Sequence, residues 1–338
     1  MTGKPAQLAA GIKALHGLTQ PRFSAPYCQS TAMSAGSQNE RHTHQGRGIL
    51  LRCLSVACFA TMSACLKYAS ADGVSAIEML FYRSLFGMPV VLIWLTLGPG
   101  IGAIRTRRPG AHLVRSLIGL TGILTYFNAL ILLPLADAAT IGFTAPILAT
   151  ILSALVLREK VGIHRWGAVL LGFIGVAIVV RPGGDALSHT GIMFALLSAL
   201  GTAGVAITIR QIGGTEHPGA IVFWFFFVCA IVSGIGMIFY GHAHGGMTTI
   251  ILIIAAIFGA SAQLLMTMSL RVAPISVVAP FDYTQIIWAS LLGWVVWASV
   301  PTMNTLAGAA LISASGLYTA LRERRLHLER LASTLPIE

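Results

Sequence analysis

The chain has 338 residues, of which 56% are hydrophobic and only 10% are charged. Soluble domains carry about 25% charged residues, so this composition excludes a water-soluble globule. Apolar runs of about 20 residues, long enough to span a bilayer, follow one another from Leu50 to Leu321. The net charge of +11 lies mostly between these runs, where charges set topology. We therefore expect a lipid bilayer around the chain and no nucleic-acid partner.

Residues 1–48 differ from the rest of the chain. They are rich in Ser, Gln, Gly, His and Arg and show no sustained apolar period, which is typical of a disordered segment. We predict a disordered cytoplasmic leader here. Met33 is an alternative start, and a chain beginning there should insert and transport normally.

The apolar runs divide into ten predicted transmembrane helices. The breaks between them carry turn residues, such as Asp72-Gly73 and the Arg108-Pro109-Gly110 sequence. The tightest break lies at Pro134, which interrupts the helix, and Asp137 can cap the next one. The predicted spans are 50–70, 76–97, 113–133, 138–157, 164–181, 190–209, 219–240, 248–269, 275–298 and 303–321.

The positions of the basic residues predict which side each loop faces. With an even number of spans both termini lie on one side, and cytoplasmic loops carry an excess of Lys and Arg. If that side is the cytoplasm, 19 of the 22 Lys and Arg residues fall in cytoplasmic segments. Only Arg181 falls outside, while Lys67 and Arg83 lie within spans. We expect a multi-pass protein of the inner membrane with both termini in the cytoplasm.

The ten spans fall into two halves of five. An odd number per half makes the second half start from the opposite face, so related halves would form an inverted repeat. Gly167 matches Gly308, and Gly175 matches Gly316, at one offset in the last helix of each half. The sequence thus predicts an all-α membrane protein with the parts 1–48 (leader), 49–181 (first repeat), 190–321 (second repeat) and 322–338 (cytoplasmic tail).

Several short stretches follow the pattern of a known family, and together they cover about 48–325. They are Arg47 to Leu51, Cys65 to Tyr68, Glu78 to Ser84, Ala136 to Thr140, Ala145-Pro146, Leu157 to Val161, Gly172 to Val176, Arg181-Pro182, Ala279 to Tyr283, Gly308 to Tyr318 and Arg322 to Arg325. In these stretches the chain resembles the EamA-type members of the drug/metabolite transporter superfamily. One departure is that members often carry a Glu after the fourth helix of each half, whereas here Glu159 has only Ser299 as its counterpart.

The resemblance implies ten helices, an inverted repeat and a central cavity with alternating access. The function it implies is secondary transport of a small metabolite (amino-acid-, vitamin- or nucleoside-like) or a drug. A coupling proton or other ion and a homodimer are possible partners. We expect the cavity near mid-membrane, lined from the first to fourth, eighth and ninth spans, with the helix-breaking Pro146 and Pro280 close to it.

Motifs for other chemistry are missing from the sequence. It has no GxxxxGK[ST] phosphate loop, no HExxH and no GxSxG, so we expect no enzyme activity and transport that runs on a gradient. Its five cysteines form no CxxC pair, and no metal or cofactor is expected. The alternatives are a multispanning enzyme of lipid metabolism and a non-transporting membrane scaffold.

Asp282 is the strongest candidate for a functional side chain. It lies about eight residues into the ninth span, roughly 12 Å deep at 1.5 Å per residue. A carboxylate at that depth costs roughly 2.5–3.5 kcal/mol on insertion scales and usually faces a cavity or a partner. Pro280 should loosen the preceding turn. We expect Asp282 either to carry a coupling proton or to form a structural ion pair.

Further polar residues in the spans are candidates for the substrate or ion pathway. Arg83 could hold an anionic group or pair with Glu78 or Asp282. Glu78 also fits a capping box with Ser75, and Lys67 can snorkel to the interface. The remaining candidates could line a cavity or simply bond neighbouring helices, and they are Tyr126, Asn128, Gln263, Tyr283, Gln285 and Trp288.

Overall fold

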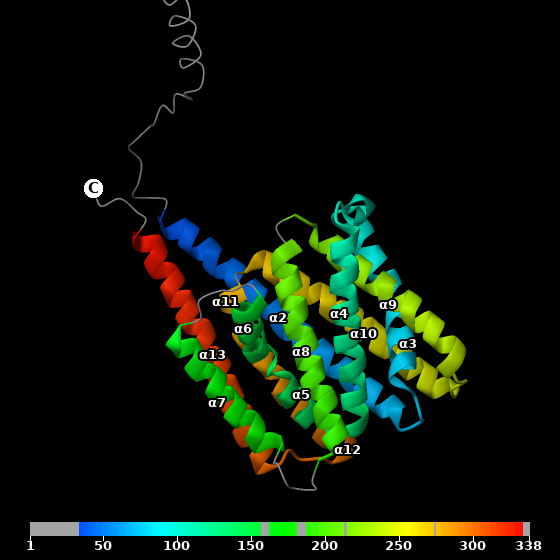
Figure 1. Cartoon of the computed structure of the whole chain (residues 1–338). Coiled ribbons are helices and arrows are strands. Elements are labelled where there is room, and N and C mark those ends of the chain that lie inside the picture. The colour runs from blue at the N-terminus through cyan, green and yellow to red at the C-terminus, as the bar shows by residue number, and fades with distance from the viewer. Residues whose placement is uncertain (1–33, 157–161, 181–186, 213–214, 274, 334–338) are drawn as a thin grey trace, which may run out of the picture. The chain divides into compact units, whose positions relative to one another are not determined.

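A computed structural model describes residues 34–156, 162–180, 187–212, 215–273 and 275–333. The chain separates into the units Met1–Thr43 and His44–Glu338, and the second unit holds nearly all the described residues. The described residues form helices and turns without a β-strand. Figure 1 shows the helices of the second unit packed side by side as a bundle.

The helix bounds follow the expected breaks closely. In chain order the helices are α2 (Ser34–Ser70), α3 (Ala76–Leu97), η1 (Ile101–Ile104), α4 (Pro109–Leu132), α5 (Leu135–Gly142), α6 (Ala145–Val156), α7 (Ile163–Val180), α8 (His189–Ile212), α9 (Pro218–Tyr240), α10 (Gly246–Val272), α11 (Ile275–Val278), η2 (Ala279–Tyr283), α12 (Thr284–Trp297) and α13 (Met303–Ser333).

Eight stretches of the described helices are long and apolar enough to cross a membrane. They run from Gly46–Ser70 to Gly246–Leu270 and correspond one to one with the first eight predicted spans, α5 and α6 together making the fourth. The prediction of an all-helical membrane protein is confirmed. The ninth predicted span is divided among α11, η2 and α12, and the tenth is the first part of α13. Ten spans therefore stay a prediction.

The amino-terminal boundary differs from the expectation. We expected residues 1–48 to lack regular structure, but α2 begins at Ser34, so 34–48 are helical. Once the apolar part has nucleated a helix, each added residue costs little, because propagation adds one hydrogen bond per residue fixed. The rest of the predicted leader, 1–33, lies outside the described residues, as do Glu159 and Arg181.

Proline marks one boundary between predicted spans and one break inside a span. Pro134 occupies the N-cap position of α5, which therefore starts before the predicted residue 138. Asp137 consequently lies inside the first turn, and the expectation that it caps this helix is wrong. Its Oδ1 instead accepts a hydrogen bond from Thr305 Oγ1 of α13 at 2.6 Å. In the ninth span Pro280 is the second residue of the 3-10 turn η2, as the expected loosening requires.

Glycines allow two pairs of helices to approach closely. A Cβ on Gly201 of α8 would lie 2.6 Å from the Cα of Gly122 of α4. A Cβ on Gly308 of α13 would lie 2.6 Å from the carbonyl oxygen of Gly175 of α7. Both pairs run side by side in Figure 1. Small residues of this kind let backbones meet where lipid provides no hydrophobic drive.

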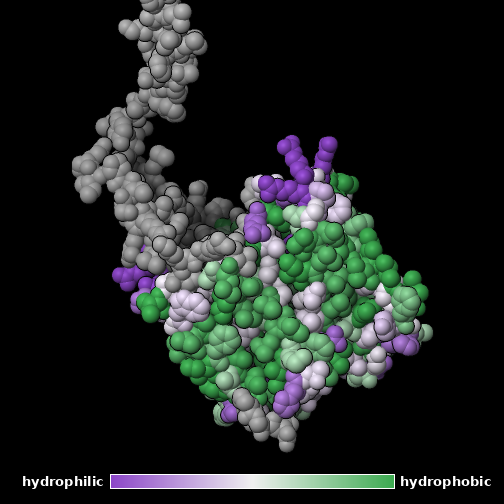
Figure 2. All heavy atoms as spheres, viewed as in Figure 1, coloured by the Kyte–Doolittle hydropathy of each residue, from purple (hydrophilic) through white to green (hydrophobic). Residues whose placement is uncertain are grey.

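The outer surface of the bundle is apolar. Leu97, Ile163, Ile238 and Met303 are among many large hydrophobic side chains that are mostly exposed. Figure 2 shows hydrophobic side chains covering the middle of the visible face, with hydrophilic ones gathered toward its upper and lower rims. A water-exposed surface rarely carries such a large apolar area, so this surface fits contact with lipid chains.

Candidate functional site: a central cavity

A cavity of about 440 Å³ opens between the helices. Its wall combines residues of α2 to α6 with residues of α8, α9, α10, η2 and α12, so it receives side chains from both halves of the chain. All six spans that we expected to line a cavity contribute to it. Two further spans also contribute, α8 through Ser198 and Thr202 and α9 through Phe225. The wall is largely apolar, and its charged members are Arg52, Arg83, Arg115 and Asp282.

Asp282 forms an ion pair with Arg52 at one part of the cavity wall. The guanidinium of Arg52 donates from Nε to Oδ1 and from Nη2 to Oδ2, so the pair is bidentate. The side chains of Arg52 and Asp282 are 12% and 31% exposed. The pair joins α2 of the first half to η2 of the second. We expected Asp282 to face either a cavity or a partner. It does both, because it lines the cavity and pairs with Arg52.

Arg83 and Arg115 lie in the wall without a counter-ion among the described residues. Arg83 is 3% exposed and Arg115 is 5% exposed. Nε and Nη1 of both side chains are buried and have no hydrogen-bond partner in the described part of the chain. Each guanidinium carbon lies over the ring of Phe225, at 5.9 Å for Arg83 and 4.4 Å for Arg115. The suggestion that Arg83 pairs with Glu78 or Asp282 is wrong, because both carboxylates have other partners.

Four more predicted residues reach the cavity. Tyr126, Gln263 and Gln285 line it, as does Pro146 in the first turn of α6. The hydroxyls of Tyr126 and Ser63 lie 3.0 Å apart and form a hydrogen bond between α4 and α2. The cavity therefore has polar side chains that could orient a solute, set among apolar ones.

Lys67 lies away from the cavity and stabilises a helix end. Its Nζ donates to the carbonyl oxygens of Leu130 at 2.9 Å and Leu133 at 2.7 Å. In an unbroken helix the residue at 134 would donate to the Leu130 carbonyl, but Pro134 has no N–H. The Lys67 ammonium replaces that missing donor. This geometry explains why a charged side chain is tolerated here.

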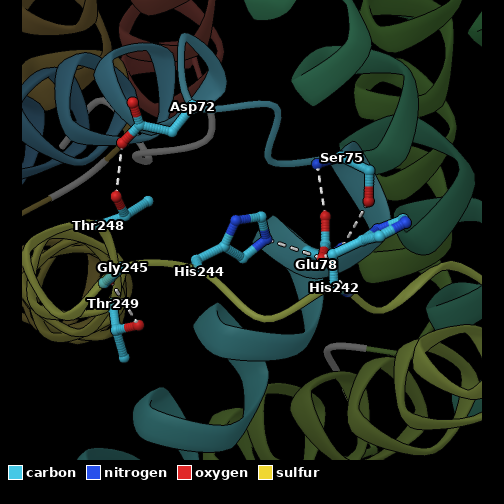
Figure 3. A network of polar contacts seen from close by, with 8 residues as sticks. All are labelled: Asp72, Ser75, Glu78, His242, His244, Gly245, Thr248 and Thr249. Carbon is cyan, nitrogen blue, oxygen red and sulfur yellow. Dashed lines mark hydrogen bonds and ion pairs between the residues drawn. The ribbon is translucent and has the colours of Figure 1, made fainter.

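Glu78 is also outside the cavity, and the predicted capping box is confirmed. Its carboxylate accepts from the backbone N–H of Ser75 at 2.7 Å and of His242 at 2.8 Å. His244 Nε2 lies 2.9 Å from the same carboxylate. Figure 3 shows His242 and His244, from the loop before α10, converging on Glu78 while Thr248 reaches Asp72. Glu78 therefore fastens this loop to the start of α3.

The remaining predicted residues do not line the cavity. Asn128 donates to the carbonyl of Leu124 in its own helix. Tyr283 packs against Phe143, with 5.0 Å between ring centroids. Trp288 is 39% exposed on α12. Pro280 is not among the described residues of the wall, although Asp282, two residues later, is.

Two arginines of the cavity wall, Arg52 and Arg115, were not predicted from the sequence as site residues. Arg52 lies at the start of the predicted span 50–70, in the middle of α2, and Arg115 lies near the beginning of α4, and we interpreted both as topological charges. The signal that could have found Arg115 is Pro109: because α4 begins there, Arg115 lies almost two turns inside the helix. No comparable signal marks Arg52.

A second buried polar pair closes the end of the bundle near the start of α4. His112 Nε2 lies 3.1 Å from Glu216 Oε2, with side chains 1% and 3% exposed. Glu216 belongs to the loop between α8 and α9, and its Oε1 accepts from the backbone N–H of Arg107. Burial alone would raise the pKa of Glu216, but hydrogen bonds from His112, Thr106 and Arg107 outweigh it and lower that pKa below its usual value.

Comparison with known proteins places these features in a family. The model of the EamA-like transporter family matches residues 46–181 and again residues 189–320. The pseudopaline exporter CntI of Pseudomonas aeruginosa is 29% identical over 78% of this chain and 93% of its own length. A riboflavin transporter of Vibrio cholerae is 29% identical over 80% of this chain and 91% of its own. An S-adenosylmethionine uptake transporter of Rickettsia bellii is 24% identical over 73% of this chain and 84% of its own length.

The fold also matches a solved structure. One protein crystal structure covers 82% of this chain and 98% of its own chain with a TM-score of 0.58 and 19% sequence identity. This likeness concerns the fold alone.

Proposed function

The chain belongs to the EamA-like transporter family, and we propose that it carries its small-molecule substrate through the central cavity by alternating access. The observation that carries this proposal is the cavity itself. It holds about 440 Å³ and takes its wall from both segments that match the family. Substrate sites of secondary transporters lie at the interface between such repeats. The cavity is therefore the natural place for the substrate to bind.

The helix contacts support ten spans arranged as an inverted repeat. Helices at corresponding places in the two halves pack together: α3 with α9, α5 with α12, and α7 with α13. The contact between α3 and α10 has its counterpart in the contact between α4 and α9. A two-fold axis in the membrane plane would produce this pattern.

The charge distribution supports an inner-membrane protein with both termini in the cytoplasm. On that assignment the Arg-rich segment before α4 and the end of α13 face inward, as the positive-inside rule requires. A reporter fused after Arg325 should be active in the cytoplasm. An external reporter at that position would overturn the ten-span arrangement.

The driving force and direction belong to the proposal as well. Relatives are named for the export of pseudopaline, for riboflavin transport and for S-adenosylmethionine uptake, so their names set no common direction. Without a phosphate loop in the sequence, we propose that a gradient of substrate, protons or another ion drives the cycle. A homodimer stays a prediction.

Filling the cavity tests the proposal. Gly142 lines the cavity, and a Cβ built there meets nothing within 4 Å. Gly142→Trp should place a bulky ring in the cavity and abolish the change in metabolite levels that overproduction of the protein causes. Gly167 is equally unobstructed but exposed on α7, so Gly167→Trp is the matched control. Full transport by a correctly inserted Gly142→Trp protein would exclude this cavity as the path.

A further inference from the structure

The charges in the cavity wall do not balance. Three guanidinium groups, those of Arg52, Arg83 and Arg115, face one carboxylate, that of Asp282. Arg52 neutralises Asp282 through a bidentate pair. Two positive charges are therefore left in the wall, on Arg83 and Arg115, with no acidic residue of the described chain beside them. A buried charge without a partner is costly in a low-dielectric interior.

Arg83 and Arg115 converge on one spot although they come from different helices. Phe225 of α9 lies under both guanidinium groups, and Arg83 also lies over the ring of Phe226 at 5.1 Å. Aromatic faces attract cations, but they leave the net charge and the N–H donors uncompensated. The rings therefore hold the two guanidinium groups in place without satisfying them.

Glycines make room for this arrangement. A Cβ on Gly119 would lie 2.9 Å from the ring of Phe225, and a Cβ on Gly259 would lie 3.3 Å from Nε of Arg83. Larger residues at these positions would displace the ring or the guanidinium. The two arginines are thus built into the packing of α3, α4, α9 and α10, which distinguishes them from charges that could swing out to the interface.

We propose that Arg83 and Arg115 form the binding subsite for an anionic group of the substrate, a carboxylate in particular. A guanidinium presents donors in a planar fork that matches a carboxylate, both side chains line the cavity, and four of their N–H-bearing atoms have no partner in the described part of the chain. The apolar body of the substrate lies along the rest of the wall, which includes Phe59 and Met62. This subsite rests on the proposed function, because it assigns the substrate class of the same cavity.

The test compares what the full chain binds before and after each charge is removed. The purified protein is incubated with the small-molecule fraction of a bacterial extract, washed, and the retained compounds are identified by mass spectrometry. Wild-type protein should retain organic acids. Because a hydrogen bond to a charged group contributes about 1.5–3 kcal/mol, Arg83→Gln and Arg115→Gln should each reduce that retention by about tenfold or more.

Two further variants separate binding from folding. Arg108 is exposed, so Arg108→Gln removes the same charge away from the cavity and should leave retention unchanged. Arg115→Lys keeps the charge without the fork and should retain organic acids more weakly than wild type but better than Arg115→Gln. Melting temperatures of the Gln variants should equal or exceed that of wild type, because an unpaired buried charge has been removed. Lower melting temperatures in both would make the arginines structural and overturn the proposal.

Three other outcomes would overturn the proposed carboxylate subsite, and each has a different consequence for the proposed function of the cavity. If the retained compounds are neutral or cationic, and Gly142→Trp still blocks transport, the subsite is wrong and the proposed function stands. If chloride or phosphate alone raises the melting temperature of wild type but not of Arg115→Gln, the arginines hold an inorganic ion. If Gly142→Trp transports normally, the proposed function itself fails.

Discussion

Charged side chains inside the bundle meet different kinds of partner. Lys67 bonds two helix-end carbonyls, Glu78 is surrounded by loop donors, and Asp282 pairs with Arg52. Arg83 and Arg115 lie over aromatic rings and have no counter-ion in the described part of the chain. An intramembrane charge is costly. The contacts of Lys67, Glu78 and Asp282 compensate that cost within the protein. For Arg83 and Arg115 we propose that a ligand compensates it.

The pair of Arg52 and Asp282 should contribute to stability as a tie between the two halves. Asp282→Asn strands the Arg52 charge, so the melting temperature in detergent should fall, equivalent to about 1–2 kcal/mol for a partly exposed pair. Arg52→Gln should do the same, and the double variant should lose less than the sum of the two. An Asp282→Asn protein of unchanged melting temperature whose net transport has lost its pH dependence would instead make Asp282 a proton carrier.

Stability should depend on pH through Glu216. Its lowered pKa means that the folded state favours the ionised carboxylate more than the unfolded state does. The resulting stabilisation is fully present above the ordinary value of 4.5 and is lost as the pH falls through the lower folded value. Glu216→Gln should therefore lower the melting temperature at neutral pH, and the difference from wild type should shrink below pH 4.5. A difference that grows in acid would contradict this sign.

At the residue scale the sequence predicted the buried charges better than their partners. Arg83 and Asp282 stand out because charges in the middle of apolar runs are rare. Arg115 did not, because a charge within two turns of a helix start resembles a topological one. Partners such as Arg52 for Asp282, 230 positions apart, depend on tertiary packing that no local pattern encodes.

At the scale of elements, proline and glycine decide where helices end and how closely they pack. Pro134 stands directly before the first helix of the fourth span, and Pro280 interrupts the ninth span, both where the sequence predicts a break. The break between α5 and α6 at 143–144 lies just before Pro146, which we expected to break a helix, although the predicted span 138–157 was drawn without an interruption. That break brings Phe143 and Pro146 to the cavity. The close crossings of α4 with α8 and of α7 with α13 follow from small residues that the sequence shows only as packing candidates.

The crossing of α4 and α8 should be sensitive to a single methyl group. Gly201→Ala would place a Cβ 2.6 Å from the Cα of Gly122, so the helices must separate. We expect a loss of about 1–3 kcal/mol, visible as a lower melting temperature. Gly167→Ala, at an open position of α7, is the control and should not lower it. Equal melting temperatures for the two variants would mean that α8 does not rely on this contact.

At the scale of the whole molecule, two matched segments enclose one cavity. The family model matches each half separately, and corresponding helices of the halves pack against each other. A site between two repeats can face either side when one repeat rocks against the other. We propose that the substrate passes through this cavity in that way.

Accessibility of the cavity from both sides tests that claim most directly. Thr202 lines the cavity, whereas Leu170 is largely exposed on the outer surface of α7. In a chain without native cysteines, Thr202→Cys should react with a membrane-impermeant thiol reagent in both right-side-out and inside-out vesicles, and Leu170→Cys in neither. Labelling of Thr202→Cys from one side only, or from neither, in a protein that still transports would contradict alternating access through this cavity.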